Sequence, residues 1–261
     1  MCFNQPISGA ISILGILAAI YLRVFHWNKK GIWRLFYPTL YFTAMEILQF
    51  FMYFWIDDCS SPINIWLTII GWLHICFQPV ASNLMSTFTK SKEDKWYFRK
   101  MFLPLAWLGA IAGASRLFFY DWQPCDPIQD PLCGAQTCTK AGSVHLAWTL
   151  RLRAPNYFTP GGFVHALTMF VPPMLFDGFV PLLLMLVSGP FLAWYIGRDK
   201  DQFAAIWCYY SIFQVIVGLW INLTGYKDFM NAQKEEGEVK APTKKPVKGK
   251  GKKQNQKRKL K

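Results

Sequence analysis

The sequence has few charged residues and contains none of the short motifs that mark the common classes of enzyme. Only 16% of its 261 residues are charged, whereas a soluble domain carries roughly 25%. It has no H-E-x-x-H zinc motif, no G-x-S-x-G nucleophile elbow and no Gly-rich phosphate loop. No two of the four histidines are spaced at i and i+4. These absences argue against a soluble enzyme, and no cofactor is expected.

Long apolar runs fill most of the chain instead. Hydrophobic residues make up 53% of it, and about 20 apolar residues suffice to cross the roughly 30 Å hydrocarbon core of a bilayer. We therefore predict an all-α, polytopic membrane protein with seven transmembrane helices within residues 1–223. The predicted spans are 8–24, 36–56, 63–88, 101–120, 161–176, 178–196 and 204–223. Because only Asp177 and Gly178 separate the fifth span from the sixth, these two could instead form a re-entrant pair.

The basic residues collect on alternate loops, and this pattern predicts the orientation. Lys and Arg are retained on the cytoplasmic side of a membrane. They are frequent in the first and third loops and absent from the second loop, residues 57–62. We expect an outer or lumenal N-terminus and a cytoplasmic C-terminus, in the endoplasmic reticulum or the plasma membrane. Residues 1–7 contain no basic side chain, which indicates a retained first span rather than a cleaved signal peptide.

Residues 224–261 are predicted to be a disordered, basic, cytoplasmic tail. Lys, Pro, Gly and Gln dominate the segment, which has too few apolar residues to bury a core. Much of the net charge of +13 lies here, so the body offers no basic face for nucleic acid. The tail could be a solvated anchor, or it could contact anionic lipid headgroups. Lys257 and Lys259 also resemble a dilysine retrieval signal of the endoplasmic reticulum.

The predicted topology sorts the seven cysteines by side. Six of them fall on or near the outer face, where an oxidising compartment favours disulfides: Cys2, Cys59, Cys125, Cys133, Cys138 and Cys208. Six cysteines allow 15 pairings, and the sequence does not choose among them. No C-x-x-C pair is present, so no metal site is predicted. We expect loop 121–159 to be a disulfide-stapled cap over the outer end of the bundle.

Polar residues within the second and third spans are the candidates for a ligand or ion site. Glu46 and Gln49 share one helix face, and His74 and Gln78 lie on one stripe of the next helix. Glu46 is about 11 residues and His74 about 12 residues from the connecting turn, so we expect them at equal depth near the middle of the bilayer. A carboxylate beside an imidazole can share a proton. The alternative is that these groups only hydrogen-bond neighbouring helices.

Several stretches of the chain resemble a family of small seven-span membrane proteins of unknown function, found in bacteria and microbial eukaryotes. The residues that carry the resemblance are Met1-Cys2, Tyr41-Phe42-Thr43, Met45-Glu46, Leu48-Gln49, Ile56-Asp57, Cys59, His74-Ile75, Phe77-Gln78-Pro79, Leu132-Cys133-Gly134, His145, Ala147-Trp148 and Trp207-Cys208. The resemblance implies that the polar residues and the outer cysteines belong to one shared construction. It implies no reaction.

The function favoured by these observations is that of a transporter, channel or small-molecule-binding protein with a polar site inside the membrane. A structural or assembly protein is the alternative, and an intramembrane enzyme acting on a lipid is a third reading. The three differ in whether the interior holds a through-path, a dry packed core or an opening to the lipid.

Overall fold

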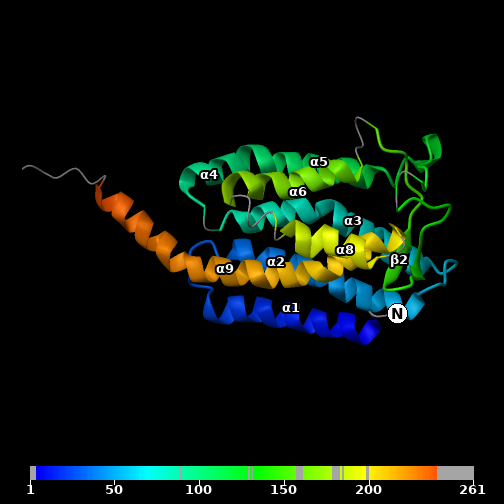
Figure 1. Ribbon diagram of the computed structural model, residues 1–261, viewed down its shortest axis with the longest axis horizontal. Coiled ribbons are helices and arrows are strands. Elements are labelled where there is room, and N and C mark those ends of the chain that lie inside the picture. Colours follow the sequence, from blue (N-terminus) through cyan, green and yellow to red (C-terminus); the bar gives the residue numbers. More distant parts are fainter. Residues whose placement is uncertain are drawn as a thin grey trace, which may run out of the picture.

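The computed structural model shows a bundle of helices that lie side by side, with a small β-hairpin at one end (Figure 1). The bundle is built from α1 (Gln5–Phe25), α2 (Trp33–Met52), α3 (Pro62–Ser86), α5 (Leu103–Ser115), α6 (Gly162–Asp177), α8 (Leu192–Ile196) and α9 (Phe203–Val239). The structure describes residues 4–88, 90–128, 130, 132–156, 161–177, 183, 185–197 and 200–239.

Local sequence signals set where the helices begin and where their geometry changes. Asn4 caps α1, because its side-chain oxygen accepts a hydrogen bond from the backbone N–H of Ile7 at 3.2 Å. The short helix α4 (Lys92–Tyr97) continues through a π-helical turn, Phe98–Phe102, into α5. A second π-helical turn, Val187–Phe191, contains Pro190 and leads into α8.

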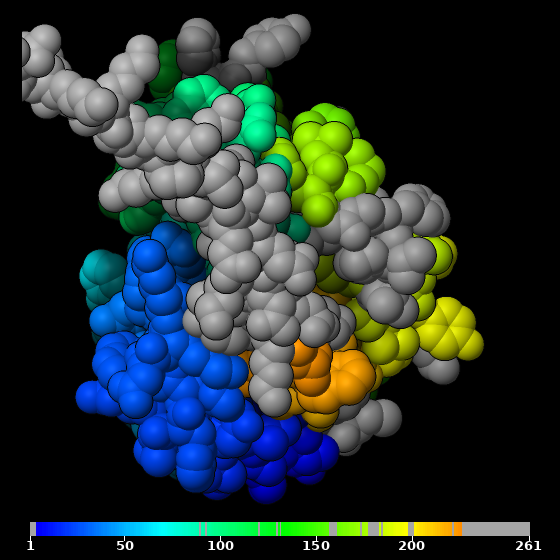
Figure 2. Space-filling view, turned by 90° about the vertical axis from the view of Figure 1, so that its left-hand side faces the viewer, coloured from blue at the N-terminus to red at the C-terminus, as the bar shows by residue number. Residues whose placement is uncertain are grey.

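The order of packing divides the bundle into two sides. Helix α1 packs on α2, α2 packs on α3 and α9, and α3 packs on α5 and α6. Seen end-on from the end opposite the hairpin, α1 and α2 lie on one side and α6 on the other (Figure 2). Helices α3 and α9 thus separate an α1–α2 side from an α5–α6–α8 side.

Three helices are long and apolar enough to cross a membrane: Gln5–Phe25, Pro62–Ser86 and Phe203–Gly225. The prediction of seven such spans is therefore supported for three. The other predicted spans are mostly helical where the structure describes them, but they fall short by length or composition. Helix α5 has 13 residues and α6 has 16, whereas α2 has 20 residues but includes several polar and aromatic side chains.

A disulfide-bonded cap covers the hairpin end of the bundle. Strands β1 (Cys138–Ala141) and β2 (Leu146–Thr149) pair antiparallel, with Cys138 opposite Thr149. One disulfide joins Cys59, in the turn between α2 and α3, to Cys138. A second joins Cys125 to Cys133. The predicted staple of loop 121–159 is confirmed in these two bonds.

The cap is inserted into the bundle rather than resting on it. The side chains of Leu146, Trp148 and Leu150 are fully buried. The Trp148 ring lies over Gly71 of α3, where an added Cβ would be 3.5 Å from the ring and 3.0 Å from Met52. A glycine at this position lets the indole approach the helix backbone closely.

Two of the six predicted disulfide cysteines are not in these bonds. Cys208 is a free, buried thiol, so its prediction was wrong. Its position in the second turn of α9 turns it inward, where the Gln78 amide Nε2 donates to its sulfur at 3.3 Å. Cys2 lies outside the described residues. Cys76 is free, as its place within a span suggested.

Helix α9 is longer than the last predicted span. It continues to Val239, so residues 224–239, assigned to the tail from their composition, are helical. This stretch contains Ala, Gln, Lys and Glu, which are good helix formers without being apolar. Residues 240–261, which hold most of the basic tail, lie outside the described residues.

Candidate functional site

The four polar residues singled out in the second and third spans do not form one hydrogen-bonded site. The Glu46 side chain is 0% exposed, and neither carboxylate oxygen has a hydrogen-bond partner among the described residues. Nε2 of His74 also has no hydrogen-bond partner among the described residues. The His74 ring instead stacks on Tyr41, with ring centroids 4.0 Å apart. No Glu46–His74 hydrogen bond is therefore formed in the described part of the chain.

Gln49 holds the cap to the bundle through His145. The Gln49 amide Nε2 donates to the carbonyl oxygen of Ala205 at 3.3 Å, which orients its Oε1 toward Nε2 of His145 at 2.7 Å. His145 Nδ1 lies 2.9 Å from the hydroxyl of Tyr53. With the proton on Nε2, His145 donates to Gln49 and accepts from Tyr53, so a neutral imidazole satisfies all three groups.

The backbone on either side of His145 is fixed as well. Oε1 of Gln202 accepts from the N–H groups of Val144 at 2.8 Å and His145 at 3.0 Å. The His145 side chain is 0% exposed, and this burial lowers the pKa of its imidazole from 6.5 to about 3. Gln49, Gln202 and His145 therefore act together as an anchor for the hairpin.

A cavity of about 700 Å³ lies on the other side of the α3–α9 partition. Its walls come from α3, α5, the cap, α6, α8 and α9. Most lining groups are apolar, and they include Trp72, Phe170 and Trp207. The rings of Phe170 and Trp207 are stacked nearly parallel at 5.8 Å. A volume of this size suits a small-molecule ligand.

Among the described residues, the cavity lining contains one ion pair, formed by Arg116 and Asp130. Arg116 follows α5 and is only 1% exposed. Its Nη2 lies 2.5 Å from Oδ2 of Asp130, and its Nε donates to the carbonyl oxygen of Arg153 at 2.8 Å. The sequence places Arg116 and His165 at similar depths near the outer ends of their spans. The structure brings both into the lining of this cavity.

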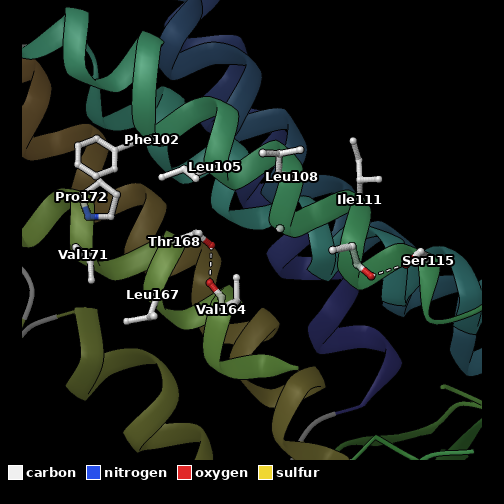
Figure 3. Close-up of a pocket in the computed structure, with 12 residues that line it drawn as sticks. Phe102, Leu105, Leu108, Ile111, Ser115, Val164, Leu167, Thr168, Val171 and Pro172 are labelled. Carbon is white, nitrogen blue, oxygen red and sulfur yellow. Dashed lines mark hydrogen bonds between the residues drawn. The ribbon is translucent and has the colours of Figure 1, made fainter. Parts of the chain in front are cut away.

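An apolar groove runs along the outside of the same wall, between α5 and α6 (Figure 3). Leu105, Leu108 and Leu167 lie along it. Gly109, Val164 and Thr168 line both the groove and the cavity. At Gly109 an added Cβ would lie 3.5 Å from Val164. Only a thin wall of small or short side chains therefore separates the cavity from the outer surface of the bundle.

A family model matches residues 6–225 of the chain, and its description is a family of unknown function, DUF5765. The chain belongs to this family. The match confirms the resemblance to an uncharacterised family and ends before the basic tail, but it carries no information on membrane spans. No curated protein and no solved structure matches the chain. Membership of the family therefore assigns no activity.

Sequence reasoning missed the two residues that connect the cap to the interior. In the sequence analysis, His145 is named only among the residues that carry the family resemblance, and Asp130 is not named. Asp130 follows Cys125 by five residues and precedes Cys133 by three, so it lies inside the small disulfide loop. A carboxylate held in such a loop is positioned for a fixed partner, and this spacing was the signal available.

Proposed function

We propose that this protein is a multi-pass membrane protein that binds an apolar small molecule in the cavity between α3, α5, α6, α8 and α9. The cavity itself carries the proposal. It is large, mostly apolar and separated from an outer apolar groove by only a thin wall. A ligand that partitions into lipid could reach it from the side of the bundle.

Exposed apolar side chains support a multi-pass arrangement. Large apolar residues project outward along the bundle, including Leu17 at 56%, Trp66 at 63%, Leu108 at 64% and Trp220 at 68% exposure. These four belong to α1, α3, α5 and α9. Such a surface is unfavourable in water and favourable in a bilayer. Helices too short or too polar to qualify alone share this outer surface with the three that do.

The two ends of the bundle differ in chemistry, which supports the predicted orientation. The disulfides Cys59–Cys138 and Cys125–Cys133 lie at the hairpin end, and disulfides persist in oxidising compartments. The two loops rich in Lys and Arg, between α1 and α2 and between α3 and α5, lie at the other end of the bundle (Figure 1). Helix α9 also leaves the bundle at that end (Figure 1). We therefore propose that the hairpin end is outer or lumenal. The basic tail would then meet the anionic headgroups of the cytoplasmic leaflet.

The inserted cap favours a binding protein over an axial channel. Trp148 and its fully buried neighbours occupy the hairpin end of the bundle, where a channel along the bundle axis would need an opening. The cavity lies beside this plug and faces the α5–α6 groove. The cavity and the groove share Gly109, Val164 and Thr168, and a ligand in the cavity lies near Arg116 rather than near Glu46.

Photo-crosslinking tests the proposal. The purified protein, reconstituted in lipid nanodiscs, is exposed to a photoreactive long-chain alcohol, and the labelled peptides are mapped. We expect labels on α6 and α9, and loss of most labelling in Ala166→Trp, because Ala166 lines the cavity. Ile13→Trp, on the exposed face of α1, is the matched control and should keep its labelling. Labels spread evenly over the outer faces, unchanged by Ala166→Trp, would refute a cavity site.

A further inference from the structure

The two charged side chains that the structure describes in the cavity lining neutralise each other. Among the described residues that line the cavity, Arg116 and Asp130 are the only two with a side chain that is normally charged at neutral pH, and they form an ion pair. A ligand with a net charge would bring that charge into an apolar enclosure without a counter-ion, at a large free-energy cost. The electrostatics of the walls therefore favour an uncharged ligand.

The ion pair is held in place by the cap and by the end of α5. The second oxygen of Asp130, Oδ1, accepts a hydrogen bond from the backbone N–H of Leu132 at 3.2 Å. The N–H of Cys133, which is in a disulfide, donates to the backbone carbonyl of Asp130 at 3.0 Å. Arg116 and Arg153 exchange further bonds, since the N–H of Arg153 donates to the carbonyl oxygen of Arg116 at 2.9 Å. The pair is thus a rigid feature of the wall.

The guanidinium group of Arg116 has one nitrogen, Nη1, that is not used in these bonds. Nε and Nη2 of Arg116 are used by Arg153 and Asp130, and Nη1 forms no hydrogen bond with any described residue. A guanidinium N–H without a partner among the described residues is favourably paired with an oxygen acceptor on a ligand. Elsewhere in the cavity lining, the stacked rings of Phe170 and Trp207 provide an apolar surface.

We propose that the cavity selects an uncharged amphiphile, whose hydroxyl, ester or ketone oxygen meets Arg116 and whose apolar body lies against Phe170 and Trp207. This inference rests on the proposed function and names its ligand class. Asp130 is the specificity-determining residue, because its charge cancels that of Arg116 and so excludes anionic lipids such as fatty acids.

Two photoreactive probes of equal chain length, a fatty alcohol and the corresponding fatty acid, test the inference in nanodiscs at pH 8, where the acid is ionised. The wild-type protein should be labelled by the alcohol at least tenfold more efficiently than by the acid. In Asp130→Asn the amide keeps an acceptor for Leu132 but removes the negative charge, so the preference should shift toward the acid. Asp121→Asn is the control, because Asp121 is an exposed acid of the same cap.

The outcomes separate the two proposals. Labelling of the wild type by neither probe overturns both of them. Equal labelling by alcohol and acid, both mapped to the cavity, leaves the proposed function standing and overturns the selection for an uncharged ligand. Should Asp130→Asn fail to fold, Gly161→Lys provides the second variant, because Gly161 lines the cavity before α6. A new cation there should also raise labelling by the acid, and no rise in either variant contradicts the inference.

Discussion

Acidification is expected to loosen the hairpin, because His145 is buried there as a neutral imidazole. Burial lowers the pKa of His145 from 6.5 to about 3. A protonated His145 could no longer accept the hydrogen bond from Tyr53 at Nδ1. When the hairpin opens, the imidazole reaches water and regains its usual pKa. The open state therefore binds a proton that the closed state excludes.

The sign and size of the effect follow from this difference in pKa. Because the pKa is lower in the closed state, the stabilisation is fully present above pH 6.5 and is lost as the pH falls toward about 3. Each pH unit below the open-state pKa lowers the free energy of opening by about 1.4 kcal/mol. From pH 7 to pH 5 the loss is about 2 kcal/mol, or about 25-fold in the opening equilibrium.

Hydrogen–deuterium exchange of the β1 and β2 amides measures this equilibrium. After correction for the intrinsic pH dependence of exchange, protection of the hairpin should fall about 25-fold between pH 7 and pH 5. His145→Gln removes the titrating group while keeping a polar side chain, and its protection should vary little over this range. Parallel pH profiles for the wild type and His145→Gln would refute the assignment of the effect to His145.

Two further changes test the packing of the interior. Trp148→Ala should destabilise the protein by about 3–5 kcal/mol, because it empties a fully buried site beside Gly71. Trp66→Ala, on an exposed face of α3, should lower the melting temperature far less, and equal losses would show that Trp148 is not a packing anchor. Glu46→Met should leave stability unchanged or raise it by up to about 3 kcal/mol, because the carboxylate is buried and has no hydrogen-bond partner among the described residues. A clear drop in the melting temperature of Glu46→Met would mean that the carboxylate has a stabilising contact.

The positions of the helices could be predicted from the sequence because apolar runs and helix length obey the same physical constraint. Span 8–24 corresponds closely to α1, and span 63–88 to α3. The number of spans was predicted less well. A run of apolar residues shows that a segment avoids water, but it does not show whether a bilayer or neighbouring helices cover it. For α2, this distinction decides whether the helix counts as a membrane span.

The site was predicted less well, because it depends on contacts between distant residues. The two disulfides used four of the cysteines expected near the outer face, but depth along the chain could not show that Cys208 turns inward. Equal depth placed Glu46 and His74 on adjacent helices without showing that His74 stacks on Tyr41. The cavity is formed by several elements far apart in sequence, and its volume results from how their side chains fail to fill the space between them. Periodicity within one helix carries no such information.

The Cys59–Cys138 bond also orders events during synthesis of the protein. Its two cysteines are 79 residues apart, and α3 and α5 lie between them. Under the proposed orientation, Cys59 enters the oxidising compartment before Cys138. It remains a free thiol until α3 and α5 have crossed the membrane. In the proposed multi-pass arrangement, the bond can close only after Cys138 has also reached that compartment, which requires that α3 and α5 have crossed the membrane. In that arrangement, closure of the bond therefore marks the point at which the chain from α1 to α5 has reached the proposed topology.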